Sequence, residues 1–316
     1  MNGGRPPCDL ETRLGGLLLA IAVVNDNLEG MRKLFLLFLL PAWSLAEIPA
    51  NPVPPFLELP SSPRTMAMGG ALVAVADDPQ AGFLNPGGLR LVPTIGYDLS
   101  FSNATGEDYD NLCATLVNPA TERGSAFGMG VWTQGLLENA EVRYYVPYSA
   151  VSWNLTGSGG LGVVARYPYR SSRMDSVDSR FEALADVTAL QRIGAFRIGA
   201  AVERAIGGAA DIAPRRIRAG AAYVAPEGVV VSYEWRGDET SRKYDFHYAS
   251  SHWGAEIAVG NYLALRGGFS NLAANHVSFG IALGNLVKGW RLECAWDVPA
   301  SQDGATRWSV GSGYRL

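Results

Sequence analysis

Residues His276–Asp297, HVSFGIALGNLVKGWRLECAWD, hold the clearest pattern in the chain, an alternation of apolar with polar or small side chains. Its apolar positions are Val277, Phe279, Ile281, Leu283, Trp290, Leu292, Cys294 and Trp296. Successive side chains of a β-strand point to opposite faces, so the pattern predicts two strands, each with one apolar face. A soluble β-sandwich shows the same alternation, and these residues alone leave open whether the apolar face meets a core or a membrane.

Similar alternation continues from Ile95 to the end of the chain and predicts about fourteen strands. We place them at 95–103, 110–117, 124–133, 148–156, 158–166, 181–190, 195–204, 215–224, 228–236, 251–259, 262–269, 276–283, 287–297 and 306–316. From the third strand on, long connections (134–147, 167–180, 205–214, 237–250 and 298–305) alternate with short ones (Gly157, 191–194, 225–227, 260–261 and 284–286). Tight turns at one end and longer loops at the other are typical of outer-membrane barrels. The sequence therefore predicts an all-β fold, a transmembrane antiparallel β-barrel of about 14 strands over residues 95–316, with both termini periplasmic.

The aromatic residues favour the same arrangement. Near the ends of strands that lead into long loops we find Trp132, Trp235, Trp253, Trp296 and Trp308. Near the short turns we find Tyr223, Tyr262, Trp290 and Tyr314. Aromatic rings prefer the headgroup level of a membrane, so these two groups predict two girdles around the barrel.

An export signal is predicted near the N-terminus. Residues 31–46 read MRKLFLLFLLPAWSLA, with a basic start, an apolar run and a small-residue cleavage site, which is the pattern of a signal peptide. The alternative, a membrane anchor, needs about 20 apolar residues, far more than this run provides. We expect residues 1–30 to be an upstream extension from a misplaced start, with Met31 as the true start and the bacterial outer membrane as the destination.

Composition and cysteine placement exclude several classes of function. The net charge is -4, with no basic excess of the kind that nucleic-acid binders show. Cys113 shares a strand face with Asn111 and Thr115, whereas Cys294 lies on an apolar face, so we predict two unpaired thiols. Neither has a Cys or His neighbour at metal-ligand spacing, and no motif of a hydrolase or phosphate-binding loop is present. We therefore expect no enzyme, no cofactor and no metal site.

The segment that precedes the barrel, residues 47–94, has a different composition. It begins Pro-rich and continues as RTMAMGGALVAVADDPQAGFLNPGGLRLV from Arg64 to Val92. A run so rich in Gly and Ala packs closely against other backbone, as a plug inside a barrel would. Asp77–Asp78–Pro79 predicts a helix start with an N-cap, with a cation site as the alternative use of the two carboxylates, and Asn85–Gly88 predicts a turn.

This segment resembles the FadL-like (OMPP1/FadL/TodX) outer-membrane superfamily, and more closely its compact PorV/PorQ-type branch. The matching residues are Arg64, Met68–Ala71, Ala74, Ala76–Asp78, Asn85–Pro86 and Gly88–Leu89, and residues 252–297 resemble the late strands of that family. The resemblance implies a small N-terminal hatch over 47–94 in the lumen of the barrel. The residues expected to serve in the hatch or its gating are Met68, Gly69, Gly70, Asp77, Asp78, Asn85 and Pro86.

Charged residues also lie on the predicted inward faces of the late strands. They are Glu234, Arg236, Glu256, Arg266, Arg291 and Glu293, and a three-residue turn at Gly260–Tyr262 would place Glu256 opposite Arg266. Two interpretations stay open, a charged lumen that selects a solute and a ladder of ion pairs that fills the interior. Many other lumen positions are small and leave room for a plug: Gly199, Gly220, Gly254, Gly280, Gly311 and Gly313. His247, His252 and His276 fall in or near the outer loops, without the convergence that a metal site needs.

Two functions follow from the resemblance. In fatty-acid channels of the family, movement of the hatch releases a hydrophobic substrate sideways through the wall, which implies a passive channel for small hydrophobic molecules. The short loops of this chain argue against the large capture region of those channels. In the PorV branch, members bind exported proteins, which implies a component of a type IX-type secretion and surface-attachment pathway. The expected partners are outer-membrane lipid with either hydrophobic small molecules or secreted proteins and their machinery, and no nucleic acid.

Overall fold

The computed structural model describes residues 62–104, 110–119, 125–135, 142–172, 180–207, 215–238, 248–271, 275–300 and 306–316. The expected upstream extension 1–30, the signal peptide 31–46 and the first part of the hatch, 47–61, lie outside these residues. The chain divides into two units after Glu47, and every described residue belongs to the second unit. Within the described ranges, no helix has the length and apolar character required to cross a bilayer.

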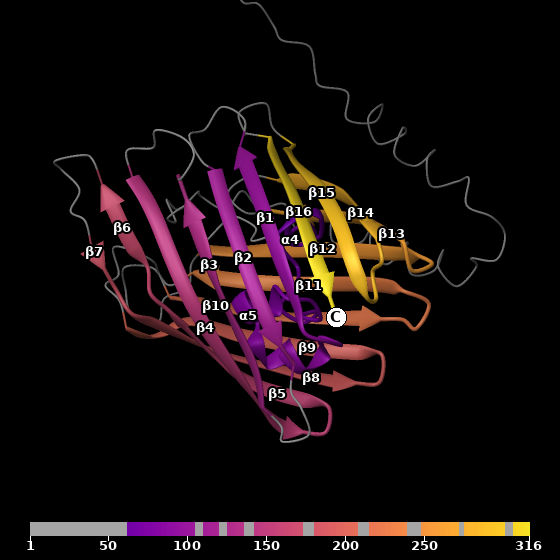
Figure 1. Cartoon of the computed structure of the whole chain (residues 1–316), viewed down its shortest axis with the longest axis horizontal. Coiled ribbons are helices and arrows are strands. Elements are labelled where there is room, and N and C mark those ends of the chain that lie inside the picture. The colour runs from indigo at the N-terminus through magenta and orange to yellow at the C-terminus, as the bar shows by residue number, and fades with distance from the viewer. Residues whose placement is uncertain are drawn as a thin grey trace, which may run out of the picture. The chain divides into compact units, whose positions relative to one another are not determined.

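Fourteen strands form a closed antiparallel barrel in the described part of the chain (Figure 1). They are β1 (Gly96–Ala104), β2 (Asp110–Asn118), β3 (Ser125–Gln134), β4 (Val142–Thr156), β5 (Gly159–Arg166), β8 (Leu184–Ile193), β9 (Phe196–Gly207), β10 (Arg216–Val224), β11 (Val229–Asp238), β12 (Tyr248–Val259), β13 (Leu263–Ser270), β14 (His276–Gly284), β15 (Gly289–Pro299) and β16 (Arg307–Arg315). Each strand pairs with the next, and β1 pairs with β16, which closes the wall. The predicted barrel is confirmed.

Strand boundaries differ most from the prediction at β4 and in the connection that follows β5. β4 begins at Val142 rather than at 148, and the predicted long loop 167–180 contains two short strands, β6 (Tyr169–Ser172) and β7 (Arg180–Phe181). The first residues of β4 pair with β6, so an additional ladder extends this part of the sheet beyond its neighbours. Pro147 lies inside β4, and the sequence pattern missed the extension because proline inside a strand pattern ordinarily marks an edge or an end.

The two faces of the wall have the predicted character. On β14 the outward Phe279 is about half exposed, whereas its neighbours Ser278 and Gly280 face inward. Glu256 pairs in register with Arg266 across the turn at Gly260–Tyr262, as expected from the sequence. An apolar outer face and a polar inner face are what a barrel in a bilayer requires.

Outward aromatic rings gather near both ends of the strands. Near the short turns, the ring of Trp290 lies 5.1 Å from that of Tyr314 and 5.7 Å from that of Tyr97. Near the longer loops, Phe279 stacks on Trp296, with centroids 5.4 Å apart. Trp132 is an exception to the predicted girdle, because its side chain faces the lumen and is buried.

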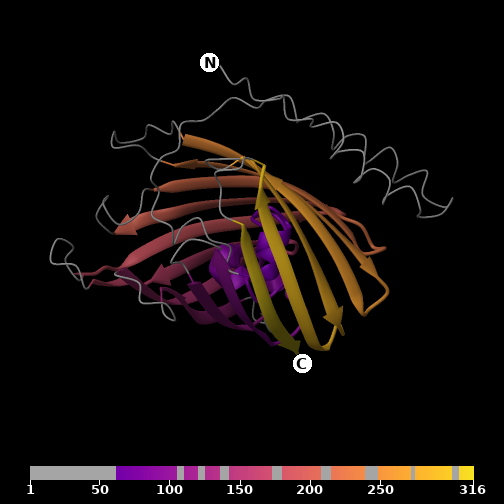
Figure 2. The same cartoon turned by 90° about the horizontal axis from the view of Figure 1, so that it is seen from above.

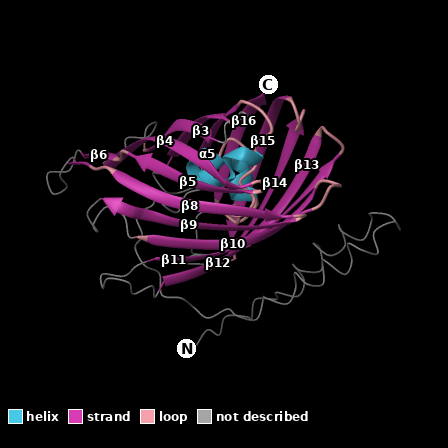
Figure 3. Cartoon of the chain, turned by 90° about the horizontal axis from the view of Figure 1, so that it is seen from below, coloured by secondary structure: helices cyan, strands magenta, loops and turns pink. Residues whose placement is uncertain are grey.

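Residues Ser62–Thr94, which we call the lumen segment, contribute no strand and lie inside the barrel (Figures 2 and 3). The segment contains α4 (Pro63–Ala67), α5 (Ala81–Leu84) and the 3-10 helix η2 (Pro86–Leu91). Ser62 caps α4 by accepting a hydrogen bond from the Thr65 amide. α4 packs on β13 to β16, α5 on β2 to β4, and η2 on β3 to β5 and on β8.

Inward glycines of the wall make room for the lumen segment. A β-carbon at Gly254 would lie 2.7 Å from the carbonyl oxygen of Met68, and one at Gly280 would lie 2.7 Å from the β-carbon of Ala67. Gly311 faces Pro63 in the same way, and Gly199 and Gly220 face Val73. The space predicted at these positions is therefore occupied by the lumen segment. The space at Gly313 is occupied by the wall residue Arg291 instead.

Candidate functional site

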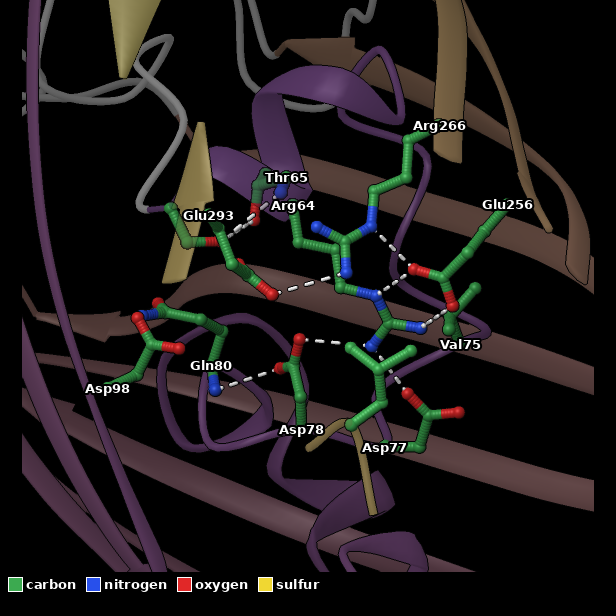
Figure 4. Close-up of polar contacts among 12 residues, drawn as sticks. Arg64, Thr65, Val75, Asp77, Asp78, Gln80, Asp98, Glu256, Arg266 and Glu293 are labelled. Carbon is green, nitrogen blue, oxygen red and sulfur yellow. Dashed lines mark hydrogen bonds and ion pairs between the residues drawn. The ribbon is translucent and has the colours of Figure 1, made fainter. Parts of the chain in front are cut away.

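Arg64 of α4 joins the lumen segment to the wall (Figure 4). Its Nε and Nη2 each donate to one carboxylate oxygen of Glu256 on β12, both at 2.9 Å. Its Nη1 donates to Asp77 at 2.6 Å and to Asp78 at 3.0 Å. Paired donation by a planar guanidinium to a carboxylate is a strong and directional contact. The side chain thus fixes α4, the turn before α5 and one wall strand to a common centre.

A ladder of ion pairs continues from this centre around the wall. Glu256 accepts from Arg266 at 2.6 Å, and Arg266 contacts Glu293 at 3.2 Å. Glu293 also contacts Arg291 at 3.0 Å. Arg291 in turn contacts Asp98 of β1 at 2.5 Å. Each of the four charged residues predicted on β12, β13 and β15 therefore contacts a residue of opposite charge. This arrangement favours the ladder of ion pairs over a charged lumen that is open to a solute.

Glu234 and Arg236 of β11 hold the backbone of the lumen segment. One oxygen of Glu234 accepts from the amides of Leu72 and Val73, at 3.0 and 2.8 Å. The other accepts from Arg236 at 2.6 Å and from Arg218 at 2.7 Å. Arg236 also donates to the carbonyl of Gly70 at 2.5 Å. A buried carboxylate with four donors loses little on leaving water, so the contact stabilises the docked backbone.

Gly69 and Gly70 lie where only glycine fits without strain. Their φ angles are 59° and 84°, in the left-handed region. A β-carbon on Gly69 would lie 2.7 Å from the carbonyl oxygen of Phe269. The Gly69 carbonyl lies 2.6 Å from Nδ1 of His252, whose ring faces the lumen and is buried. Met68, the residue before them, is also fully buried.

Asn85 fastens the second half of the lumen segment. Its amide nitrogen donates to the carbonyl of Val73 at 2.6 Å and to that of Ala189 on β8 at 3.2 Å. Its side-chain oxygen accepts from the Gly87 amide at 3.0 Å and so caps η2, which replaces the simple turn predicted here. Pro86 begins η2 and packs at Gly162 of β5, where a β-carbon would lie 2.8 Å from its Cγ.

The N-cap role predicted for Asp77 and Asp78 holds only in part, because Asp78 accepts from the backbone amide of Gln80 at 2.9 Å in the turn before α5. α5 begins at Ala81, its N-cap is Gln80, and no side chain caps it. Asp77 instead contacts Arg64 and Arg197, the latter at 2.9 Å. Burial opposes the charge of Asp77, but the two guanidiniums outweigh it and hold the pKa of that carboxyl well below its usual range.

Several partners in the site were not singled out from the sequence. Arg197 of β9 donates to the carbonyl of Val75 at 2.6 Å as well as to Asp77. Arg166 of β5 donates to the carbonyl of Phe83 at 2.8 Å and contacts Asp186 at 2.5 Å. Both arginines occupy inward positions of the alternating strand pattern. This position was the signal in the sequence by which they could have been found. What they contact could not be inferred, because the path of the lumen segment was unknown.

The lumen segment meets the two sides of the wall differently. The ion pairs between the lumen segment and the wall lie toward β9 and β12. The wall pair Arg166–Asp186 lies at β5 and β8, where Arg166 also donates to the Phe83 carbonyl. Toward β2 to β5 the contacts are mainly apolar or aromatic; the ring of Phe83 lies 5.1 Å from that of Tyr148.

Cys113 is on the β2 side of the lumen and is buried, whereas Cys294 is partly exposed on the outer face, and both are free thiols. In the described part of the chain, no group of three His, Cys, Asp or Glu residues is arranged to hold a metal, and His247 lies outside it.

No family model and no curated protein matches the chain. Among solved structures, it is similar to the toluene transporter TbuX of Ralstonia pickettii, with a TM-score of 0.57 and 12% identity over 81% of this chain and 98% of that one. A mutant porin of Rhodopseudomonas blastica aligns with 71% of this chain and 99% of that one, at 13% identity, but its TM-score of 0.40 carries no argument.

These observations establish the fold, a closed antiparallel β-barrel like that of TbuX, with a segment of the same chain in its lumen. The fold expected from the resemblance to FadL-like barrels is confirmed, and TbuX shares it. The narrower resemblance to the PorV/PorQ-type branch stays a prediction.

Proposed function

We propose that this chain is a passive outer-membrane channel for small hydrophobic molecules and that the lumen segment is its gate. The observation that carries the proposal is the mode of docking. The described lumen segment contributes no strand to the wall, and its contacts with the wall run largely through side chains such as Arg64, Glu234 and Asn85. Such a segment can shift without disrupting the backbone ladder. The largely apolar side near β2 to β4 offers a hydrophobic solute a surface that the ionic side does not. The fold is also shared with a protein described as a toluene transporter.

The proposed orientation places the short turns in the periplasm. Ile95, where the wall begins, accepts a backbone hydrogen bond from Leu316, so the start and the end of the barrel lie at the same end. That end also carries the short turns 157–158, 194–195 and 260–262. Outer-membrane barrels generally have short turns in the periplasm and longer loops outside.

The gate can be tested by a reversible lock. Cysteines replace Ala67 and Gly280, whose β-carbons would be close enough to bridge after a small outward shift, in a chain with Cys113→Ala and Cys294→Ala. The assay measures initial uptake of radiolabelled toluene by a Gram-negative host that lacks its own channels for hydrophobic compounds. We expect uptake above the empty-vector rate in the reduced form, loss of that excess on oxidation, and recovery with dithiothreitol.

The matched control carries Gly280→Cys alone and should not respond to oxidation. Equal uptake by the oxidised and reduced double variants would contradict gating by the lumen segment. Uptake no faster than that of vector cells, in cells where the barrel is folded and abundant, would contradict the channel itself. If secreted proteins could then be crosslinked to the chain, the protein-binding alternative would be favoured.

A further inference from the structure

Two buried amides on the apolar side of the lumen stand apart from the rest of the site. Asn111 of β2 and Gln134 of β3 are register partners, and both side chains are almost fully buried. Within the part of the chain that the structure describes, neither polar atom of the Gln134 side chain has a hydrogen-bond partner, and Oδ1 of Asn111 has none either. The amide nitrogen of Asn111 makes one long contact, 3.4 Å to the hydroxyl of Ser102.

Unpartnered amides are unusual in a protein interior. Buried polar groups nearly always have a hydrogen-bond partner, and exceptions call for a physical explanation. In this barrel the contrast is local, because Asn85, which holds the lumen segment, uses both ends of its side chain. A glutamine amide carries two donors and an acceptor, so Gln134 offers both functions into the lumen.

Two aromatic residues lie next to this pair of amides in the sheet, one on the same strand face and one in the same register row. Trp132 precedes Gln134 by two positions on β3 and therefore lies on the same inward face. Tyr144 of β4 is the register partner of Gln134 on its other side. Trp132 belongs to the buried apolar cluster that also contains Phe83 and Tyr148, and Tyr144 packs against that cluster. Flat rings beside a polar edge suit a planar ligand that carries a single hydrogen-bonding group.

We propose that Asn111, Gln134 and the ring of Trp132 form a binding site for a small aromatic molecule that carries one hydroxyl group, such as a phenol. The proposal rests on the proposed channel function and names its preferred substrate class. The ligand ring would stack on Trp132, and its hydroxyl would donate to one amide oxygen and accept from the Gln134 nitrogen. A neutral ligand fits this row, since Ser102, Asn111, Gln134 and Tyr144 are uncharged, and Arg170 of β6 is the first charge along it. Phenols are neutral near pH 7, because their pKa is about 10.

The test compares p-cresol with toluene, which differ by one hydroxyl group. Gln134→Leu removes the unpartnered amide and keeps a side chain of similar size, so the barrel should fold normally. The matched control is Gln191→Leu, at the short-turn end of β8, where the side chain donates to Ser158 at 2.8 Å. Uptake of each compound is measured in the same cells. We expect Gln134→Leu to reduce p-cresol uptake by about three- to tenfold, the effect of one hydrogen bond, with toluene uptake unchanged.

Binding to the purified full-length chain gives a second readout. Tryptophan fluorescence should show saturable quenching by p-cresol in the wild type and in Gln191→Leu, and non-saturable quenching in Gln134→Leu. Both compounds could enter wild-type cells while Gln134→Leu changes neither the ratio of p-cresol to toluene uptake nor the quenching by p-cresol. That result would contradict the binding site but not the channel. If neither compound enters faster than in vector cells, the proposed channel fails, and only saturable binding that depends on Gln134 would still support the site.

Discussion

At the scale of single residues, Arg64 joins the lumen segment to the wall and also holds two acidic residues of the segment itself. It contacts Asp77, Asp78 and Glu256, all of them shielded from water to a large extent. Carboxylates in such surroundings are stable as ions only while their partners are present. The charge of one arginine therefore supports the position of three acidic side chains, two of which belong to the lumen segment itself.

Replacing Arg64 should release the lumen segment. Arg64→Ala leaves three buried carboxylates short of a partner, and breaking a buried pair in this way costs about 3–5 kcal/mol. We expect the temperature at which the purified barrel loses its fast gel mobility to fall, and proteolysis within 62–92 to become faster. Arg64→Lys should give an intermediate loss, since an ammonium cannot make the paired contact with Glu256.

Arg192→Ala is the matched control, because Arg192 is exposed at a short turn and donates to the Gly194 carbonyl. An equal loss in both alanine variants would mean that the Arg64 contacts add nothing beyond a surface arginine.

At the scale of elements, the lumen segment and the wall strands are shaped to each other through glycine. β12 contributes Gly254, β14 Gly280 and β16 Gly311, each at a point where the lumen segment passes. Close approach of two backbones excludes a β-carbon between them. Pro63, Ala67 and Met68 of the lumen segment therefore pack directly against these glycines of the wall.

A larger side chain at one of these glycines should displace the lumen segment and leave the wall intact. Gly254→Val would bring its β-carbon to 2.7 Å from the Met68 carbonyl oxygen, and overpacking of this kind costs about 1–3 kcal/mol. We expect faster hydrogen exchange in 62–75, measured by mass spectrometry, with the exchange of β8 and β9 unchanged.

The control for this experiment is Gly157→Val, at the turn between β4 and β5. Nothing lies within 4 Å of a β-carbon there, so exchange in 62–75 should stay at the wild-type rate. Protection of 62–75 that persists in Gly254→Val would show that the close packing is not needed for docking.

At the scale of the whole barrel, the even number of wall strands places the two ends of the barrel sequence at one rim. The strand ends that the longer connections join, among them Gly207 and Arg216, lie at the other rim. An epitope inserted in 239–247 should be labelled by antibody on intact cells. One inserted after Glu227, in a short turn, should be labelled only after the outer membrane is permeabilised. Labelling in the opposite order would reverse the proposed orientation.

The strands of the wall could be predicted nearly one by one. For the site, the sequence predicted which residues take part but few of the contacts between them. Glu256 and Arg266 were expected to face each other because one short turn fixes the register between them. Asp77 and Asp78 were assigned to a helix cap, because the nearest partners along the chain were backbone amides. Asp78 does accept from the Gln80 amide, but the charged partners of the two residues, Arg64 and Arg197, come from outside the turn, and no local pattern identifies them.

The sequence by itself determined the strands, their two faces and the charges that point inward, because the alternation of side chains along a strand is a local property of the backbone. The tertiary structure alone decided which charges far apart in the sequence meet. Arg64 and Glu256 are 192 positions apart in the chain, and they come together only when the wall has closed and the lumen segment has taken its path inside it. Closure also buries Gln134 without a partner, because the environment of an inward side chain depends on every strand and segment that surrounds it.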